Sequence, residues 1–467
     1  MGRKKINLVL KDLEIVDINT KGMGVGKQDG RVFFVAGAVP GDIVSATAFR
    51  KRRGYWEARL DRIEASSPNR VEAVCDYFGL CGGCKWQHLD YKAQLHFKEK
   101  EVAHNLTHIG KVTPEHTKPI LGAPKSYFYR NKMEFSFSSQ RWLTADEIAQ
   151  DTPIERRGVG FHKPGMWDKV VDIHQCHLQA DPSNAIRNYI RHYALEQNLS
   201  FFNPRSQEGF LRTLLIRTTR LGEVMVLLQF FYDDPTEIDA LLAALLGAFP
   251  AISSLLYCVN SKANDSLYDQ KIQAYTQQDY IQEKMGHLTF QITAKSFYQT
   301  NSEQTERLYS LVKEMAQLQP HEIVYDLYTG TGTIAQYVAN QCQKVIGIES
   351  VPEAIEAAKV NAKNNSITNV AFEVGDMKDC FNQGFISRHG KAQLVITDPP
   401  RSGMHPKVVK QLLELAPERI VYVSCNSATQ ARDLSLLKAN YRIELSQAID
   451  LFPQTQHVEN VVLLVRL

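Results

Sequence analysis

From His321 onward the chain alternates between short apolar segments and longer segments with helical periodicity, and this alternation constrains the fold more than any other feature. The segments expected to form strands are 323–327, 344–348, 370–374 and 394–397. Strands that alternate with helices are typical of a doubly wound parallel sheet. We therefore expect a Rossmann-like α/β domain at the C-terminus, over residues 291–467.

A glycine-rich turn, Asp326-Leu-Tyr-Thr-Gly-Thr-Gly332, follows the first of these strands and precedes a helix. Such a turn lets the backbone approach a ligand closely, and a helix N-terminus supplies N–H donors and a positive dipole. Glu349 ends the next strand, where a carboxylate can accept hydrogen bonds from ribose hydroxyls. The third glycine of a dinucleotide motif is missing, which favours S-adenosylmethionine over the nicotinamide alternative.

Two motifs downstream indicate covalent chemistry. Cys425 ends the apolar strand in Val421-Tyr-Val-Ser-Cys-Asn426, and the carboxyl ends of strands face the ligand crevice of an open α/β sheet. Asp398-Pro-Pro-Arg-Ser-Gly403 is close to the Asn/Asp-Pro-Pro-aromatic motif of amino-group methyltransferases, but Arg401 stands in place of the aromatic residue. A nearby thiol without that aromatic favours methylation at carbon, after covalent activation of the ring.

Three cysteines lie close together in Cys75-x5-Cys81-Gly-Gly-Cys84, and Cys176 offers a fourth thiol. Four thiolates suit zinc or an iron–sulfur cluster. The uneven spacing favours [4Fe–4S], whereas His174 and His177 keep zinc open, and a purely structural group of thiols is a third interpretation. The remaining cysteines outside the catalytic motif are expected to be small core residues: Cys258, Cys342 and Cys380.

Residues 1–65 contain short β segments separated by glycine turns, which predicts a small OB-like barrel. Residues 1–70 carry 14 Lys and Arg against 8 Asp and Glu, although the net charge of the whole chain is only +3. The basic turn Lys51-Arg-Arg-Gly54 precedes Tyr55-Trp56, a pairing that suits phosphate contact and base stacking. We expect this part to bind nucleic acid; an ordinary solvated surface is the alternative.

Residues 70–290 are expected to form a central, mostly antiparallel α+β domain that carries the cysteine cluster, with a helix over 92–120 packed on the C-terminal domain. The uncharged run 240–259 is as apolar as a membrane span, but Pro250 divides it into a helix end and a strand. No targeting segment is visible and the cysteines are not spaced as disulfides. We expect a cytoplasmic monomer that contacts no membrane.

Three further segments complete the pattern: Lys21-Gly-Met-Gly-Val-Gly26, Ser296-Phe-Tyr-Gln-Thr-Asn301 and Asp450-Leu-Phe-Pro-Gln-Thr-Gln-His-Val-Glu459. Together with the motifs above, they resemble the RNA uracil-5-methyltransferases of the RlmD/RumA and TrmA group over nearly the whole chain. The resemblance implies an N-terminal TRAM domain, a [4Fe–4S] cluster and a class I methyltransferase domain that uses S-adenosylmethionine. Thr329 departs from the family, which usually has Cys at that position.

The resemblance also implies a role for each matching residue. Cys425 corresponds to the nucleophile and Glu459 to the general base. The implied cluster ligands are Cys75, Cys81, Cys84 and Cys176. The implied contacts with S-adenosylmethionine, or for the last with substrate, are Gln299, Tyr328, Thr333, Glu349, Asp376 and Asp398.

These residues predict methylation of carbon 5 of a specific uridine in 23S ribosomal RNA, with a transfer RNA uridine as the alternative substrate. Cys425 is expected to add to carbon 6, with a thiol pKa lowered by Arg401 or by the cofactor's sulfonium. The target base must leave its stack to reach such a pocket. Two hypotheses of another class are an inactive RNA-binding or assembly factor and a radical iron–sulfur enzyme.

Overall fold

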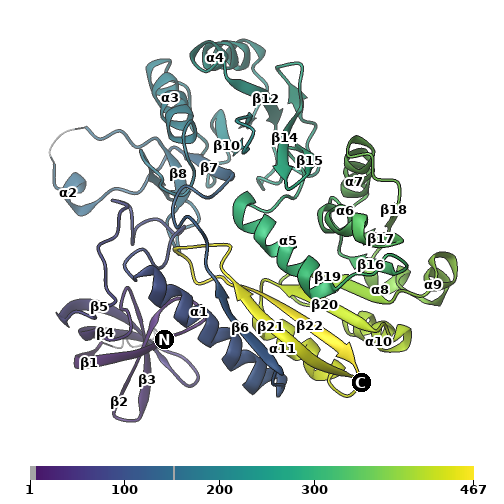
Figure 1. Cartoon of the computed structure of the whole chain (residues 1–467). Helices are drawn as coiled ribbons and strands as arrows, with labels where there is room; N and C mark the ends of the chain where they lie inside the picture. Colours follow the sequence, from purple (N-terminus) through teal and green to yellow (C-terminus); the bar gives the residue numbers. More distant parts are fainter. Residues whose placement is uncertain (1–6, 151–152) are drawn as a thin grey trace.

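The structure, a computed structural model, describes residues 7–150 and 153–467. Its N-terminal part is a closed five-stranded barrel in the order β1-β2-β3-β5-β4, purple in Figure 1. The strands are β1 (Leu8–Ile18), β2 (Gly24–Gln28), β3 (Arg31–Ala36), β4 (Ile43–Lys51) and β5 (Trp56–Ala65). Alternate side chains such as Leu13, Phe33 and Val44 fill its interior. The barrel predicted by the glycine turns is therefore present.

The middle of the chain forms a seven-stranded sheet in the order β13-β12-β11-β10-β7-β8-β9. Its neighbours are antiparallel except β11 with β12. The strands are β7 (Lys132–Ser138), β8 (Gly158–His162), β9 (Val170–Asp172), β10 (Leu211–Thr218), β11 (Val224–Phe230), β12 (Ile252–Val259) and β13 (Gln273–Ala274). One face packs against α3 (Ser183–Glu196) and α4 (Pro235–Ala248). The short helix α2 (Ala145–Ile148) lies in the connection from β7 to β8.

The C-terminal part is built on an eight-stranded sheet in the order β18-β17-β16-β19-β20-β22-β21-β6, with its last strands in yellow in Figure 1. The five strands from β18 to β20 run parallel, and β22 is antiparallel to both of its neighbours. The strands are β6 (His116–Leu121), β16 (Ile323–Leu327), β17 (Lys344–Glu349), β18 (Val370–Val374), β19 (Leu394–Thr397), β20 (Arg419–Ser424), β21 (Tyr441–Ile449) and β22 (Glu459–Arg466).

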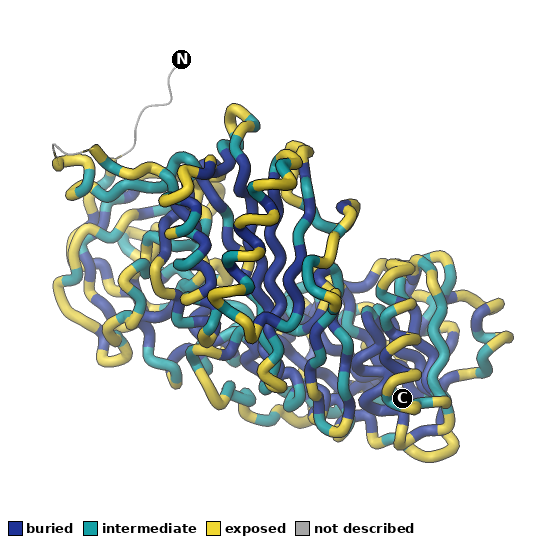
Figure 2. Tube along the Cα trace, turned by 90° about the horizontal axis from the view of Figure 1, so that it is seen from above, coloured by how far each residue is buried: buried dark blue, intermediate teal, exposed yellow. Residues whose placement is uncertain are grey.

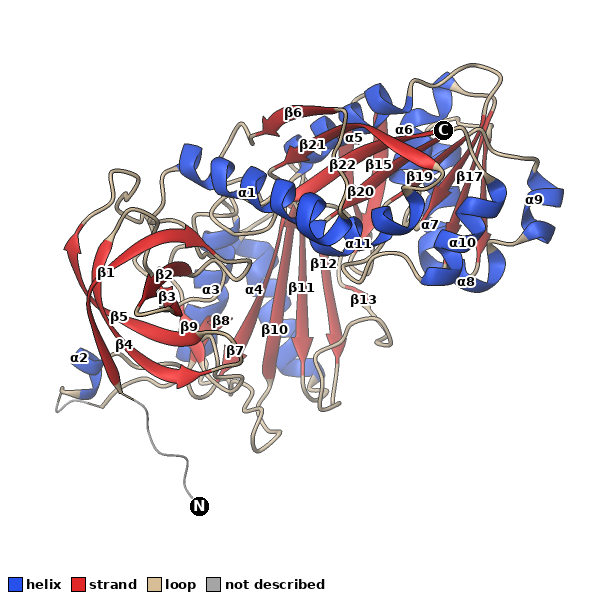
Figure 3. Ribbon diagram, turned by 90° about the horizontal axis from the view of Figure 1, so that it is seen from below, coloured by secondary structure: helices blue, strands red, loops and turns tan. Residues whose placement is uncertain are grey.

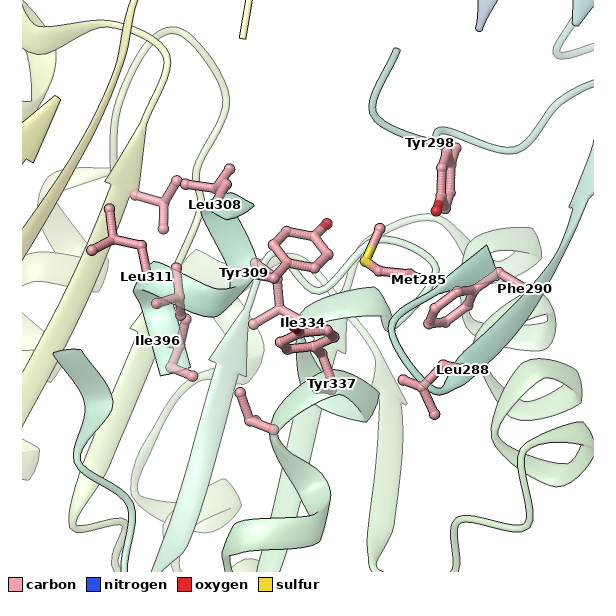
Figure 4. Packing of buried hydrophobic residues seen from close by; sticks show 14 of the residues in the cluster. Met285, Leu288, Phe290, Tyr298, Leu308, Tyr309, Leu311, Ile334, Tyr337 and Ile396 are labelled. Atoms are coloured by element: carbon pink, nitrogen blue, oxygen red, sulfur yellow. The ribbon is translucent and has the colours of Figure 1, made fainter. Parts of the chain in front are cut away.

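Helices cover both faces of this sheet. One hydrophobic cluster joins the sheet to α5 (Ser302–Ala316), α6 (Thr333–Val338) and the hairpin of β14 (Tyr280–Met285) and β15 (Leu288–Thr293). Figure 4 shows this packing, with Tyr309 of α5 facing Ile334 and Tyr337 of α6. The other face carries α8 (Met377–Cys380), α9 (Gln383–His389), α10 (Pro406–Leu415) and α11 (Ser427–Leu437). A further helix, α7 (Pro352–Asn364), leads into β18.

The helix expected over 92–120 is shorter than predicted. It consists of α1 (Tyr91–Asn105) and a π-helical turn over Leu106–Gly110, and Lys111 then adopts a left-handed conformation with φ +50°. Pro114 disfavours helix at the residue before it, and the chain continues as β6, which pairs in parallel with β21. Figure 3 shows α1 and α11 side by side. The segment therefore contributes an edge strand to the C-terminal sheet.

The apolar run 240–259 forms the second half of α4 and strand β12, both packed in the core of the central part. In Figure 2, buried residues form long continuous stretches along the strands of the larger sheets. Every residue of β11 is buried. Across the described residues, each helix is too short or too polar to cross a membrane.

Candidate active site

A cleft of about 1080 Å³ opens at the carboxyl ends of the parallel strands, beside the segment that precedes α5. This edge of the sheet is where open α/β folds bind ligands. Most residues predicted from the sequence line it: Gln299, Tyr328, Thr333, Glu349, Asp398, Cys425 and Glu459. Arg401 and His457 also line the cleft. The fold thus brings together residues that lie up to 160 positions apart, from Gln299 to Glu459.

The glycine-rich turn at the carboxyl end of β16 is tight. Tyr328, Gly330 and Gly332 all have positive φ values, of +63°, +56° and +73°. A Cβ atom on Gly332 would lie only 2.7 Å from the Phe372 ring, so this position requires glycine. Gly330 N–H donates to Glu349 Oε2 at 3.2 Å. The turn is thereby fixed against the acidic residue expected to bind ribose.

Asp326, at the start of this turn, is buried and holds the turn to α6. Its Oδ2 accepts hydrogen bonds from the Thr329 hydroxyl and from Ala335 N, the latter at 3.1 Å. Burial raises the pKa of Asp326 to about 7. Thr329, the residue that departs from the family, therefore takes part in fixing the turn.

Asp376 lies outside the residues that line the cleft. It caps α8, where it accepts from Lys378 N at 3.2 Å and pairs with Lys378 Nζ at 2.5 Å. Its side chain is 51% exposed, and the Lys378 hydrogen bond holds the pKa of its carboxyl below its usual range. Its neighbour Gly375 nevertheless donates to the Glu349 carbonyl at 2.8 Å, so Asp376 lies next to the cleft but outside its lining.

The reacting groups come from three strand ends. Cys425 follows β20, Asp398 follows β19 and Glu459 begins β22. Burial raises the pKa of Glu459 to about 8, and the charge of Asp398 adds to this shift. Burial likewise raises the pKa of Asp398 to about 7, with a further contribution from Asp326. Within residues 7–150 and 153–467, neither Asp398 nor Glu459 uses its carboxylate in a hydrogen bond or ion pair.

The environment of Cys425 differs from the prediction of a lowered thiol pKa. Burial and the negative charges of Glu459 and Asp398 raise the pKa of Cys425 to about 11. Arg401 lowers the thiol pKa, as expected, but its effect is smaller than that of burial, of Glu459 or of Asp398. The prediction missed the physical cause because it considered Arg401 without the two carboxylates on neighbouring strands.

The loop from Asp450 to Glu459 is held from several directions. Asp450 Oδ1 accepts from Lys98 Nζ of α1 at 2.6 Å, and both side chains are fully buried. Tyr91 OH donates to the other Asp450 oxygen at 3.0 Å. The Gln454 carbonyl accepts from the backbone N–H groups of Lys85 and Trp86, at 2.8 and 3.0 Å.

Sequence reasoning missed these anchors. The signal that could have revealed Lys98 was a lysine within an otherwise helical, partly apolar segment; its partner Asp450 lies 352 residues away. Because Lys85 and Trp86 directly follow Cys84, the cysteine segment is joined by main-chain hydrogen bonds to the loop that leads to Glu459.

The four predicted cysteine ligands line a second cavity, of about 350 Å³. Burial raises the pKa of each thiol, and neighbouring thiols further raise the pKa values of Cys75, Cys81 and Cys84. As placed across the described chain, no three His, Cys, Asp or Glu side chains stand close enough to hold a metal ion. The donor set and the space still fit a four-thiolate centre, with Cys75, Cys81, Cys84 and Cys176 as its ligands.

The two cavities share part of their walls. Gly83, Arg130 and Thr300 line both of them. Arg130 sits beside Tyr129, whose hydroxyl donates to the Pro453 carbonyl at 3.0 Å. The cysteine segment is therefore a neighbour of the cleft, and a basic side chain stands at the boundary.

A family model described as tRNA (Uracil-5-)-methyltransferase matches residues 267–467. A Porphyromonas gingivalis protein, called an uncharacterized RNA methyltransferase, is 51% identical over 97% of this chain and 99% of that protein. A Bacteroides thetaiotaomicron protein with the same name is 50% identical, over 95% and 99%.

Among solved structures, the chain is similar to the Pyrococcus abyssi tRNA (uracil-54, C5)-methyltransferase in complex with S-adenosyl-L-homocysteine. The TM-score is 0.74 and the identity 30%, and the match covers 98% of this chain and 100% of that chain. The likeness extends over the barrel, the central part and the C-terminal sheet, and it assigns the chain an α/β methyltransferase fold.

Proposed function

This chain belongs to the family of S-adenosylmethionine-dependent RNA uracil-5-methyltransferases, and we propose that it methylates carbon 5 of one uridine in 23S ribosomal RNA through a covalent adduct of Cys425. The observation that carries this proposal is the meeting of Cys425, Asp398 and Glu459 in one cleft that also contains the glycine-rich turn. A thiol and a carboxyl that face each other suit a reaction in which one group adds to the ring and the other removes a proton.

In the proposed mechanism, the Cys425 thiolate adds to carbon 6 of uracil, and the electron pair of the 5,6 double bond moves toward carbon 5 as an enolate. Carbon 5 then takes the methyl group, and the bond between that methyl and the sulfonium sulfur breaks. Glu459 removes the hydrogen of carbon 5, the carbon 6–sulfur bond breaks, and the double bond and the thiolate are restored. Asp398, which lines the same cleft, would hydrogen-bond the edge of the uracil ring.

The electrostatics of the cleft support this division of roles. A pKa of about 8 suits Glu459 as a base near neutral pH, because a base works best when its pKa lies close to the working pH. The raised thiol pKa of Cys425 requires a positive charge in the complex. We assign that charge to the sulfonium of bound S-adenosylmethionine together with Arg401, with Asp398 protonated and Glu459 ionised as the base.

We propose that Gln299, Tyr328, Thr333 and Glu349 contact S-adenosylmethionine. Figure 1 shows the barrel beside α1, the helix whose Lys98 pairs with Asp450. We assign residues 1–65 to a TRAM-like, RNA-binding barrel of the OB type, 70–290 to a central domain and 291–467 to a Rossmann-like class I methyltransferase domain. The strand β6 belongs to the sheet of the last, although it lies within the second range. RNA would meet Arg130 and Arg401 at the cleft, with the target uridine flipped out of its stack.

We further propose that Cys75, Cys81, Cys84 and Cys176 hold a [4Fe–4S] cluster, with zinc as the alternative. When bound, the cluster would supply a rigid cross-link among three chain segments. A fixed Cys84 would also fix the next two residues, Lys85 and Trp86, whose N–H groups donate to the Gln454 carbonyl. Anaerobic purification should give a brown protein with iron and sulfide; a colourless protein with one zinc would assign the alternative.

A transfer RNA uridine is the second candidate substrate, because the similar Pyrococcus abyssi structure is named as a tRNA (uracil-54, C5)-methyltransferase. Mapping 5-methyluridine by mass spectrometry in ribosomal and transfer RNA from a deletion strain tests both. Loss of one 23S site supports the first substrate, and loss from transfer RNA alone overturns it. An unchanged modification map would favour an RNA-binding factor without catalysis.

A further inference from the structure

Arg187 carries a buried charge for which the described residues offer no carboxylate partner. Its side chain has 0% exposure, and its Nε and Nη1 atoms have no hydrogen-bond partner among residues 7–150 and 153–467. Nη2 makes one long contact, 3.4 Å, with Asn188 Oδ1. A guanidinium is a permanent cation, so burying it without an anion is strongly unfavourable.

Nearby arginines show how the same chain satisfies this group elsewhere. Arg191, one turn further along α3, makes three hydrogen bonds to the Asp172 carboxylate, of 2.7 to 3.0 Å. Arg212, which is also buried, donates through Nη1 to the carbonyls of Asn260 and Lys262. Arg187 instead lies over the Phe135 ring, with its Cζ 4.9 Å from the ring centroid.

The face of α3 that carries Arg187 holds the segment around Cys176. Asn184 accepts from Cys176 N at 2.8 Å and donates to Cys176 O at 3.1 Å. Asn188 donates to the carbonyl of His174 at 2.9 Å. Residues three positions apart share a helix face, so Arg187 projects from the same face as Asn184, which holds Cys176.

The ionisable groups that face Arg187 are Cys176, Tyr77, Asp172 and Asp181. Tyr77 and Cys176 line the cysteine cavity, and Asp172 is already paired with Arg191. The Phe135 ring beneath the guanidinium packs against Phe161, at 5.0 Å between centroids, and Phe161 lines the cavity too. The unpaired cation therefore stands directly behind the wall formed by the cysteines.

We propose that Arg187 is the counter-charge of the four-cysteine centre. The inference rests on the proposed metal centre, in which Cys75, Cys81, Cys84 and Cys176 bind as thiolates and make the site negative. Arg187 stabilises that negative charge from a position outside the ligand set. Since reduction of an iron–sulfur cluster adds one further negative charge, the buried cation favours the reduced state and raises the reduction potential.

The test compares Arg187→Met, Arg187→Gln and Arg187→Lys with wild type, each purified anaerobically as the full chain. Arg191→Lys is the matched control, because it changes an arginine of the same helix and keeps a cation beside Asp172. We would measure iron and acid-labile sulfide per chain, the rate of iron loss to a chelator, and the midpoint potential by spectroscopic titration. A parallel Co²⁺ titration of the metal-free proteins measures the affinity of the four cysteines for a metal ion when no cluster is present.

We expect Arg187→Met and Arg187→Gln to have a more negative midpoint potential, faster iron loss and about tenfold weaker Co²⁺ binding. Arg187→Lys keeps the charge and should stay close to wild type, as should Arg191→Lys. Wild-type potential, iron retention and Co²⁺ affinity in either neutral variant would overturn the role of Arg187. If wild type itself binds neither iron, zinc nor Co²⁺, the proposed metal centre fails, and that result is distinct because it appears before any substitution.

Discussion

The active-site cleft and the cysteine cavity adjoin, yet their charges are arranged in opposite ways. In the cleft, two carboxyls with raised pKa values, Asp398 and Glu459, stand near the thiol of Cys425. In the cysteine cavity, four thiols stand near the permanently charged Arg187 and Arg130. The cleft therefore contains groups that can gain or lose protons near neutral pH, whereas the cavity would keep a fixed negative charge once its thiols bind the proposed metal centre.

This difference in surrounding charge explains why the thiolates of one chain can be disfavoured at one site and favoured at another. Cys425 faces acids that oppose the thiolate, so the thiolate forms only when a cation enters the cleft. The thiols of the cavity meet cations that the fold itself supplies. We infer that the first site is switched on by its cofactor and that the second holds its charge permanently. The following experiments test this difference between the two sites.

The largest effect is expected from Cys425→Ala. Without the thiol, the ring is not activated, so methyl transfer should fall by ~10⁴-fold or more. RNA and S-adenosylmethionine should still bind, as measured by filter binding and calorimetry. Cys258→Ala is the matched control, because Cys258 is buried in β12 away from the cleft. Retained turnover in Cys425→Ala would exclude the covalent scheme.

Glu459→Gln should slow complete turnover by ~10²–10⁴-fold, because the proton of carbon 5 is no longer removed. Addition and methyl transfer should continue, so a complex of protein and methylated RNA should accumulate that survives denaturing electrophoresis. The Cys425→Ala, Glu459→Gln double variant should show no such complex. Normal product release from Glu459→Gln would assign the base to another residue.

Breaking the buried pair of Lys98 and Asp450 should destabilise the protein by about 3–5 kcal/mol, since Lys98→Met leaves an unpaired buried carboxylate. Denaturant unfolding measures this loss. Lys100→Met is the control on the same helix: its partner Asp17 is exposed, so the expected change is about 0–1 kcal/mol. Equal stability of the two variants would contradict the assignment of Lys98 as the anchor of the catalytic loop.

The acids of the cleft predict a stability that falls as pH rises. Their pKa values are about 7 to 8 in the folded chain, against 3.8 to 4.5 for ordinary Asp and Glu, so the folded state binds more protons between pH 4 and 8. Glu459→Gln should therefore stabilise the protein at pH 8 by roughly 1–3 kcal/mol and have little effect at pH 4. Thermal unfolding at both pH values checks this sign.

Local motifs made much of the cleft predictable. The turn at Asp326 and the thiol after β20 were visible because each stands at a strand end, where parallel topology fixes its neighbours. Glu459 was predicted only from its resemblance to the C-terminal motif of the family. The barrel was visible for a similar reason, since short strands and glycine turns repeat along the chain.

Long-range contacts were not predictable in the same way. Arg187 and Lys98 look like surface residues of ordinary helices, and only the tertiary packing shows that both are buried. The raised thiol pKa of Cys425 in the chain without cofactor was not foreseen, because it depends on carboxyls from two other strands. The helix beyond Gly110 was mispredicted because β21 offered an edge that a strand could extend.

The smallest effect is expected at Asp376. It lies outside the cleft lining, paired with Lys378, so Asp376→Ala should raise the KM for S-adenosylmethionine by no more than about threefold and cost ~0.5–1 kcal/mol as a lost helix cap. Asp376→Ser keeps the cap but removes the charge and so separates the two contributions. Glu349→Ala, which alters a residue of the cleft lining, should raise the same KM further. A larger increase for Asp376→Ser than for Glu349→Ala would mean that α8 moves when the cofactor binds and brings this carboxylate against it.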